Sequence, residues 1–344
     1  MSQQSPIDVV LTWVDPSDAE WQLSKSRHAG IEVTATIDAS EERYRDWGTL
    51  KYVFRGIDRY MPWIRTVHFV TCGQKPEWLN PAAAGLALVD HSDFIPSEYL
   101  PTFNINPIEL NFHRIPGLAN RFIYFNDDMF CVGDARPSDF FDGMKVRDQA
   151  AFHLVCPDER FEDSAACLWM NNTSVLAKHF HTGQASFWKA WLSPKNGLTH
   201  VGLTLLLNIL SRGRMMPMFF HHLPLALLKS CYSEVWEAET DLLDSICRNR
   251  FRSRGDLSVM LIKDWQILRG LFVPSNVRSR GAVVWNPTQR SGLRRVEKAL
   301  SSSSIKLLCV NDSDTGEVPF AEASRIVRAL FEAAFPTKSR FEVS

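Results

Sequence analysis

Residues 120–128 read NRFIYFNDD, and this stretch decides the fold class of the chain. Residues 120–125 are rich in aromatic and β-branched side chains, which is typical of a β-strand. The strand runs directly into Asn126, Asp127 and Asp128, residue types that favour turns. The stretch therefore predicts an apolar strand whose end carries carboxylates.

The same arrangement recurs in LLCVND (307–312) and, more loosely, in LTWVDPSD (11–18). In open α/β sheets, ligands bind outside the carboxyl ends of the strands. Carboxylates gathered there repel one another unless a positive group joins them, and a divalent cation shared with a ligand's phosphates would do so. The alternative is that each Asn-Asp pair only forms a turn.

The first 140 residues alternate between predicted strands and helices. A continuous apolar run such as IDVVLTWV is typical of a strand that is covered on both faces. Strands are predicted at 7–14, 65–71, 87–89 and 120–125, and a helix at 42–61. This alternation predicts a doubly wound α/β domain.

Between residues 142 and 300 the predicted elements are mainly helices. Helices are predicted at 188–192, 201–210 and 234–250. Residues 276–298 are basic through Arg278, Arg280, Arg290, Arg294 and Arg295, which is most simply a solvated face. A buried strand at 305–310 and a helix at 322–335 follow.

Composition excludes several classes of protein. The 344 residues carry 38 Lys and Arg against 39 Asp and Glu, whereas a general nucleic-acid binder needs a basic excess. The seven cysteines form no CxxC pair, which argues against a disulfide framework and for a reducing compartment. The N-terminus does not resemble a signal peptide, and no apolar run approaches the roughly 20 residues of a membrane span. We therefore expect a cytoplasmic protein.

Motif searches narrow the chemistry. The chain contains no GxxxxGK[ST], GxGxxG, HExxH or GxSxG motif and no compact Cys/His cluster. Nucleophilic serine or cysteine chemistry has no support in the sequence. Phosphate chemistry with a bound metal is supported by the acid-bearing strand ends.

Several blocks resemble the Stealth family of capsule and exopolysaccharide hexose-1-phosphate transferases. This family is similar to the catalytic subunit of the lysosomal-enzyme N-acetylglucosamine-1-phosphotransferase. Its first two blocks are matched by IDVVLTWVD (7–15) and by the stretch from RYRDWGTL (43–50) to FNDDMFCVGD (125–134). The third is matched loosely by HHLPLALLKS (221–230) and FRSRGDL (251–257), and the fourth by CVNDSD (309–314) and FPTKSRFE (335–342). Pro16 departs from the glycine that is common in the family.

The resemblance implies a Rossmann-like, glycosyltransferase-A-like α/β core formed by residues 1–141 and 301–344. Residues 142–300 are then a largely helical insertion that contributes to the active site and the acceptor pocket. The implied reaction moves a sugar-1-phosphate from a nucleotide sugar to a hydroxyl of an oligosaccharide or polysaccharide, and a nucleoside monophosphate leaves. Two alternatives remain open: a metal-dependent glycosyltransferase and a non-catalytic carbohydrate-binding protein.

The family motifs also imply site residues. Asp128, His222, Arg252 and Asp312 are the expected catalytic residues, and Asp127, Asp128 and Asp312 are the expected ligands of Mg²⁺ or Mn²⁺. Asp15, His113 and Arg114 are candidates for substrate binding, and Asp8 could contact the nucleotide or stabilise the first strand.

Each assignment has a competing interpretation. Asp127 could cap a turn, His222 could be a packed core histidine, and Arg252 could belong to a solvated basic helix end. His113 and Arg114 could serve packing alone.

We also expect a peripheral association with a membrane-bound polysaccharide assembly and no nucleic-acid partner.

Overall fold

A computed structural model describes residues 5–32, 46–156, 165–182, 185–312 and 316–343. Its centre is a five-stranded sheet in the order β3-β2-β1-β4-β8. The first four strands run parallel and β8 is antiparallel to β4. The strands are β1 (Ile7–Thr12), β2 (Val67–Thr71), β3 (Leu86–Asp90), β4 (Arg121–Phe125) and β8 (Leu225–Leu228). The order 3-2-1-4 is that of a Rossmann-like half-sheet, which confirms the predicted α/β class.

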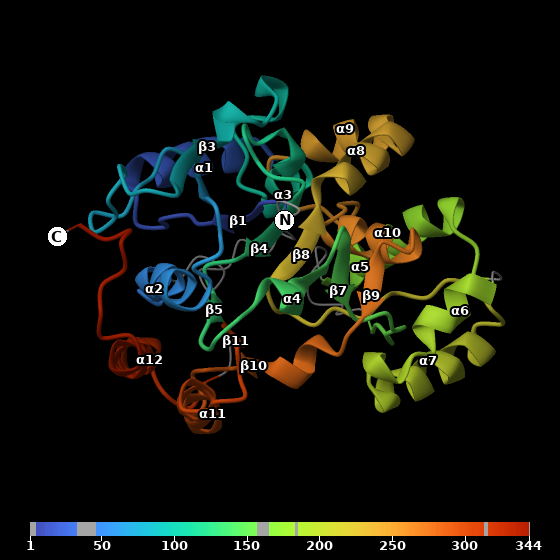
Figure 1. The fold of residues 1–344 in the computed structure, drawn as a ribbon. Coiled ribbons are helices and arrows are strands. Elements are labelled where there is room, and N and C mark those ends of the chain that lie inside the picture. Colours follow the sequence, from blue (N-terminus) through green and yellow to red (C-terminus); the bar gives the residue numbers. More distant parts are fainter. Residues whose placement is uncertain (1–4, 33–45, 157–164, 183–184, 313–315, 344) are drawn as a thin grey trace.

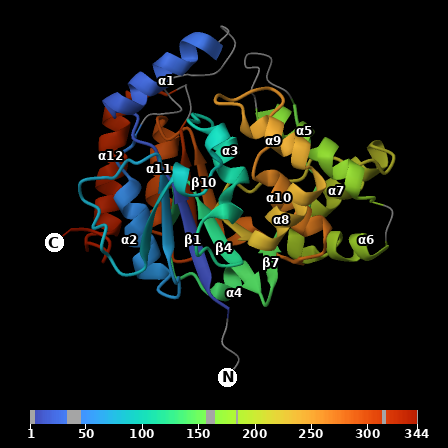
Figure 2. The ribbon, with the colours of Figure 1, turned by 90° about the horizontal axis from the view of Figure 1, so that it is seen from above.

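Helices cover both faces of this sheet, which is why β1 and β4 are buried along their whole lengths. In Figures 1 and 2, α2 (Leu50–Tyr60) and α12 (Phe320–Ala334) lie on one side. On the other side lie α3 (Ile105–Leu110), α8 (Lys229–Ala238) and α9 (Thr240–Cys247). Helix α1 (Ala19–Glu32) follows β1.

A second sheet continues from the end of β4. Its strands are β10 (Gly281–Trp285), β11 (Leu307–Asn311) and β5 (Met129–Cys131). Because β5 begins directly after the 126–128 turn and pairs antiparallel with β11, the turn is held against the C-terminal segment. Helix α2 approaches β5 so closely that a Cβ on Gly56 would lie 2.3 Å from the carbonyl oxygen of Cys131.

The segment 142–300 contains most of the remaining elements. Its helices include α5 (Ala165–His179), α6 (Ala185–Trp191), α7 (Leu198–Leu210), α10 (Met260–Leu268) and α11 (Arg290–Leu300). Strands β7 (Lys145–Asp148) and β9 (Phe272–Pro274) form a third sheet with β6 (Phe141–Asp142), which follows α4 (Pro137–Phe140). The segment also donates β8 and β10 to the other two sheets. The boundaries at residues 141 and 301 stay a prediction.

Two local expectations differ from the structure. The helix predicted at 234–250 is broken at Glu239, whose φ of −134° is not helical, and therefore becomes α8 and α9. The basic stretch 276–298 is only partly a solvated face. Arg290, Arg294 and Arg295 are exposed on α11, whereas Arg278 and Arg280 are half-buried. Residues 42–45 of the predicted helix 42–61 lie outside the described residues.

Candidate functional site

The two acid-bearing strand ends meet in the structure. The amide of Val310 donates a hydrogen bond of 2.9 Å to the carbonyl oxygen of Asp128. The thiol of Cys309 lies 3.3 Å from Oδ2 of Asp128 and donates to it. Asp312 follows two residues after Val310 and is half-buried. The turn after β4 and the end of β11 thus form one polar cluster.

His222 joins this cluster from the loop that precedes β8. Its backbone adopts the left-handed region, with φ of 53°. Its ring lies 4.9 Å from the Phe220 ring and 4.8 Å from the Trp285 ring, and its side chain hydrogen-bonds with Asn311. The aromatic contacts and the amide fix the imidazole at the end of β11.

Asp128, His222 and Cys309 lie close enough together to surround a divalent cation. Their ligating atoms all lie within 4.8 Å of one another. Oδ1 of Asp128 is buried without a hydrogen-bond partner among the described residues, so one acceptor of the cluster is unsatisfied. Because the Cys309 thiol donates to Asp128 and its pKa is raised, the groups of this cluster that can bind such an ion are the Asp128 carboxylate and the His222 imidazole.

Burial dominates the electrostatics of the cluster. Although the Asp127 side chain reaches solvent, the protein around its carboxyl desolvates it and raises its pKa to about 7, helped by the charges of Asp128 and Asp46. Desolvation raises the pKa of Asp128 to about 6 and that of Cys309 well above its ordinary value. It lowers the pKa of His222 to about 4. A bound cation would favour the charged carboxylates.

Arg278 is a site residue that the sequence interpretation missed. It is half-buried just before β10, and its charge helps to lower the pKa of His222. Its Nε is buried and has no hydrogen-bond partner among the described residues. Burial lowers the pKa of this guanidinium. A desolvated cation beside a carboxylate cluster is suited to bind phosphate oxygens.

A second polar network lies at the carboxyl ends of β1 and β4. The hydroxyl of Tyr124 lies 2.8 Å from Oε1 of Glu109 and also hydrogen-bonds with Asn126. Thr12 donates to Oδ1 of Asn126 at 3.3 Å. Burial raises the pKa of Glu109 to about 7, and the charge of Arg252 opposes this shift. Arg252 is therefore near this network, on the same edge of the sheet as Asp127.

The loop that carries Arg252 is organised by Asp256, a fully buried carboxylate. Asn104 and Asn106 donate to its Oδ2 at 2.7 and 3.1 Å, and Asn249 donates to its Oδ1 at 2.8 Å. The backbone and hydroxyl of Ser253 each donate at 3.0 Å. Arg252 thus sits on a fixed loop. The sequence interpretation missed Asp256 because it is surrounded by arginines.

Asp15 lies beyond the end of β1, where its carboxylate accepts hydrogen bonds from the backbone and hydroxyl of Ser17. It lines a pocket of about 370 Å³ together with the indoles of Trp13 and Trp78. Asp46 lines the same pocket and also raises the pKa of Asp127. The pocket is therefore next to the acid cluster.

His113 and Arg114 are placed differently. The His113 ring stacks on Tyr232 at 5.6 Å, and the Arg114 guanidinium lies 4.8 Å from the Trp236 ring centre, both on α8. Burial lowers the pKa of His113 to about 3, helped by Arg114. These contacts serve the packing of α8, and a substrate-binding role for the two residues stays a prediction.

Asp8 lies at the opposite edge of the sheet, at the start of β1. Burial raises its pKa, but hydrogen bonds from His68, Arg65 and the amide of Ala119 outweigh this effect and keep the pKa below its ordinary value. Asp8 therefore stabilises the first strand.

Comparisons with known proteins agree with this geometry. Residues 5–28 match Stealth protein CR1, conserved region 1, and residues 43–149 match Stealth protein CR2, conserved region 2. The chain is 33% identical over 341 residues to the receptor polysaccharide phosphotransferase WefC of Streptococcus oralis, which covers 98% of this chain and 99% of the relative.

Two further relatives are similar over comparable lengths. The capsular polysaccharide phosphotransferase WcwK of Streptococcus pneumoniae is 33% identical over 352 residues, covering 98% of this chain and 99% of its own. The exopolysaccharide phosphotransferase cps2G of Lactiplantibacillus plantarum is 30% identical over 340 residues, covering 98% and 96%. With full-length relatives at this identity, the chain belongs to the Stealth family and is a phosphotransferase.

Proposed function

We propose that the enzyme transfers a sugar-1-phosphate from a nucleotide sugar to a hydroxyl group of a glycan during capsule or exopolysaccharide synthesis. The observation that carries this proposal is the convergence of Asp128, His222 and Arg278, with Asp312 nearby, at the carboxyl ends of the strands. The printed names of the relatives support the reaction class.

The nucleotide sugar is most simply a UDP-sugar whose base occupies the pocket beside Asp15. This pocket offers the flat indoles of Trp13 and Trp78 to a base and lies beyond the ends of β1 and β2. Nucleotides commonly bind at this edge of doubly wound sheets. The diphosphate then reaches the neighbouring acid cluster.

We assign Mg²⁺ or Mn²⁺ to Asp128 and Asp312, with Asp127 beside them. When bound, the ion would neutralise charge on the diphosphate. These ions prefer oxygen ligands, and the Cys309 thiol already donates to Oδ2 of Asp128. Cys309 is therefore assigned to holding the carboxylate in place.

The remaining residues accept the proton of the acceptor hydroxyl and stabilise the negative charge of the phosphates. The oxygen of the acceptor hydroxyl attacks the phosphorus nearest the sugar, and the bond from that phosphorus to the bridging oxygen breaks. His222 is neutral and accepts the hydroxyl proton, and a neighbouring diphosphate would raise its low pKa. Arg278 and Arg252 stabilise charge on the transferred phosphoryl group and on the departing nucleoside monophosphate.

We place the reaction at the inner face of the cell membrane, on a glycan held by a membrane-bound polysaccharide assembly. Among the described residues, no helix has both the length and the apolarity that crossing a bilayer requires. The association is therefore proposed as a peripheral one.

The identity of the released nucleotide tests the reaction. The enzyme is incubated with UDP-sugars and a glycan acceptor, and the nucleotides are separated by chromatography. UMP together with a phosphodiester in the product supports the proposal, whereas UDP with a phosphate-free product indicates a glycosyltransferase and overturns it. Retained nucleotide-sugar binding without any turnover would indicate a carbohydrate-binding protein. Full activity in excess chelator would overturn the metal assignment.

A further inference from the structure

Eight of the 13 residues of helix α7, LTHVGLTLLLNIL, are aliphatic. Its inner side packs on the protein: Leu207 is buried, and the buried hydroxyl of Thr204 accepts a 3.0 Å hydrogen bond from the amide of Phe152. The apolar side of a helix normally packs against another part of the protein or against a partner. The outer side of α7 is not enclosed by the described part of the chain.

Five large aliphatic side chains are exposed on this outer side, each to between 42% and 76%. They are Leu198, Leu205, Leu206, Ile209 and Leu210. At 100° per residue they fall on one arc of the helix. No other described helix or strand carries more than one exposed large apolar residue. Single exposed leucines are ordinary, but a contiguous group indicates an interaction surface.

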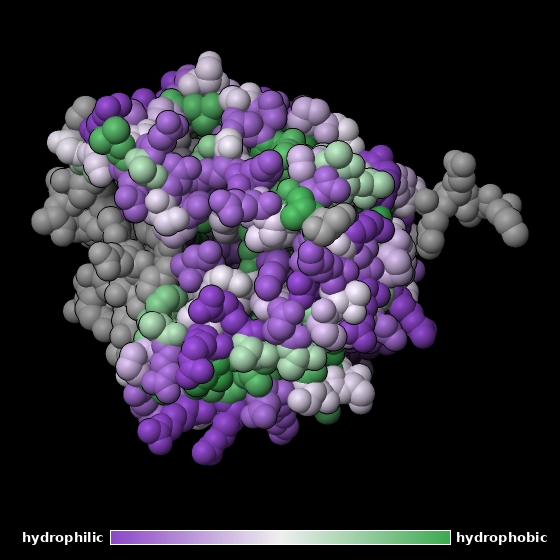
Figure 3. Space-filling model, turned by 90° about the vertical axis from the view of Figure 1, so that its left-hand side faces the viewer, coloured by the Kyte–Doolittle hydropathy of each residue, from purple (hydrophilic) through white to green (hydrophobic). Residues whose placement is uncertain are grey.

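The opposite side of the molecule has a more hydrophilic surface. Figure 3 shows the side on which α2, α12 and the C-terminus lie, and its visible surface is mostly hydrophilic. Helices α5, α6 and α7 lie together at the other end of the molecule, beyond the edge strand β8 (Figures 1 and 2). The exposed aliphatic group therefore marks one end of the protein.

Charge identifies the partner of this end. Residues 165–233 contain six Lys or Arg residues and no Asp or Glu, although the whole chain carries 39 acidic residues. Lys189, Lys195, Arg212 and Arg214, which flank α7 in the sequence, are all exposed. A second copy of this chain would bring like charges together across the interface. An anionic lipid surface would instead attract them.

We propose that the α7 face, formed by the five exposed aliphatic residues with Lys195 and Arg212, docks on an anionic lipid bilayer. The helix lies in the plane of the interface, because 13 residues are too few to span a bilayer. An apolar face flanked by basic side chains is typical of interfacial helices. This inference rests on the proposed transfer reaction at the inner face of the membrane, and it names the surface that contacts the lipid.

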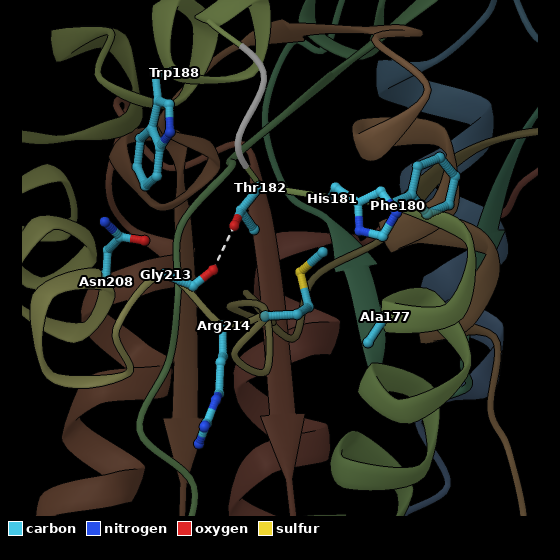
Figure 4. Close-up of a pocket in the computed structure, with 9 residues that line it drawn as sticks. Ala177, Phe180, His181, Thr182, Trp188, Asn208, Gly213 and Arg214 are labelled. Atoms are coloured by element: carbon cyan, nitrogen blue, oxygen red, sulfur yellow. Dashed lines mark hydrogen bonds between the residues drawn. The ribbon is translucent and has the colours of Figure 1, made fainter.

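A pocket of about 630 Å³ next to α7 fits the same orientation. Asn208 of α7 and Arg214 line it, together with Trp188 of α6 (Figure 4). The Thr182 hydroxyl donates to the carbonyl oxygen of Gly213 across the pocket, which ties the turn after α7 to the segment after α5. Tryptophan is enriched where proteins meet the lipid headgroups.

Vesicle flotation of the full-length protein tests the proposal. We expect the protein to float with vesicles made of equal parts phosphatidylglycerol and phosphatidylcholine, and to bind vesicles of phosphatidylcholine alone at least tenfold more weakly. The double variant Leu206→Glu, Ile209→Glu should lose at least tenfold in binding. Lys195→Gln with Arg212→Gln should also lose about tenfold or more, since each basic residue near an anionic surface contributes about fivefold.

The control is Leu88→Glu, which places one such carboxylate on an exposed leucine of β3, away from α7. It should bind vesicles like the wild type. Circular dichroism checks that each variant is folded. Absence of wild-type binding, or unchanged binding by the Leu206→Glu, Ile209→Glu variant, would overturn the proposal. So would a wild-type dimer, seen by light scattering, that this variant dissociates.

Turnover with a soluble glycan acceptor separates this inference from the proposed reaction. The α7 variants should keep wild-type nucleotide release in that assay, because no catalytic residue is changed. Vesicle binding without nucleotide release would overturn the reaction and leave the docking surface standing. Nucleotide release without vesicle binding would overturn the docking surface and leave the proposed reaction standing.

Discussion

The amide of Val310 donates a 2.9 Å hydrogen bond to the carbonyl oxygen of Asp128, a residue 182 positions earlier in the chain. This bond continues the antiparallel pairing of β5 with β11, and it fixes where both acid-bearing strand ends lie. Two acid-bearing segments from distant parts of the sequence therefore lie side by side.

Asp312→Asn should lower the rate of phosphosugar transfer by about 10²-fold or more, because the proposed metal ligand loses its charge. The measurement is steady-state nucleotide release at saturating Mg²⁺. The control is Asp142→Asn, which removes an exposed carboxylate that pairs with Arg147. Surface ion pairs of this kind contribute little to stability. Equal rates for the two variants would contradict the assignment of Asp312.

Arg278→Gln should raise the KM for the nucleotide sugar and lower kcat, together by about 10²-fold in kcat/KM, because a desolvated cation beside His222 is lost. Arg278→Lys should recover part of this loss, since it restores the charge without the planar guanidinium. Arg290→Gln on the exposed side of α11 is the control. An unchanged kcat/KM in Arg278→Gln would show that Arg278 takes no part in binding the nucleotide sugar or in the transfer.

Glu342→Gln should lower the free energy of unfolding by about 3 kcal/mol, because removing one partner of a buried ion pair strands the other. Arg55 donates to both carboxylate oxygens of Glu342 at 2.8 Å, and both side chains are buried. Glu332 also accepts from Arg55 but is 48% exposed. Glu332→Gln should therefore cost less than about 1 kcal/mol. Urea denaturation compares the two, and equal losses would contradict the difference in burial.

The strands of the central sheet could be predicted because each is a short apolar run that ends in turn-forming residues. The convergence of Asp128 with the end of β11 could be expected from the rule that ligands bind at the carboxyl ends of strands. The place of Arg278 in the site could not be predicted, because it depends on the parallel pairing of β10 with β11, which no local pattern encodes. Cys309 was missed for a related reason: a continuously apolar strand does not reveal which side chain faces the site.

Asp256 shows a different limit. The stretch FRSRGDL has the composition of a solvated basic segment, yet its single acid is buried and accepts hydrogen bonds from Asn104 and Asn106, about 150 residues away. Hydrogen bonding between distant segments leaves no periodic signal in a sequence. The family resemblance supplied Arg252, and the structure supplied the group that holds its loop.

Glu109 should make stability depend on pH. Burial raises its folded-state pKa to about 7 from an ordinary value of 4.5. Between these two pH values the folded protein binds more protons at this site than the unfolded chain. Stability therefore falls as pH rises from about 4.5 to 7 and levels off above. A shift of this size corresponds to at most about 3 kcal/mol.

Glu109→Gln removes the titrating group while keeping an oxygen that can accept from Tyr124. The wild type should lose up to about 3 kcal/mol more stability than this variant between pH 5 and pH 8, as measured by urea denaturation at both pH values. Glu297→Gln, on the exposed side of α11, should lose as much as the wild type. The other buried acids titrate equally in all three proteins, so the difference isolates Glu109. An identical pH dependence in Glu109→Gln and the wild type would show that Glu109 is ionised in the folded enzyme throughout this range.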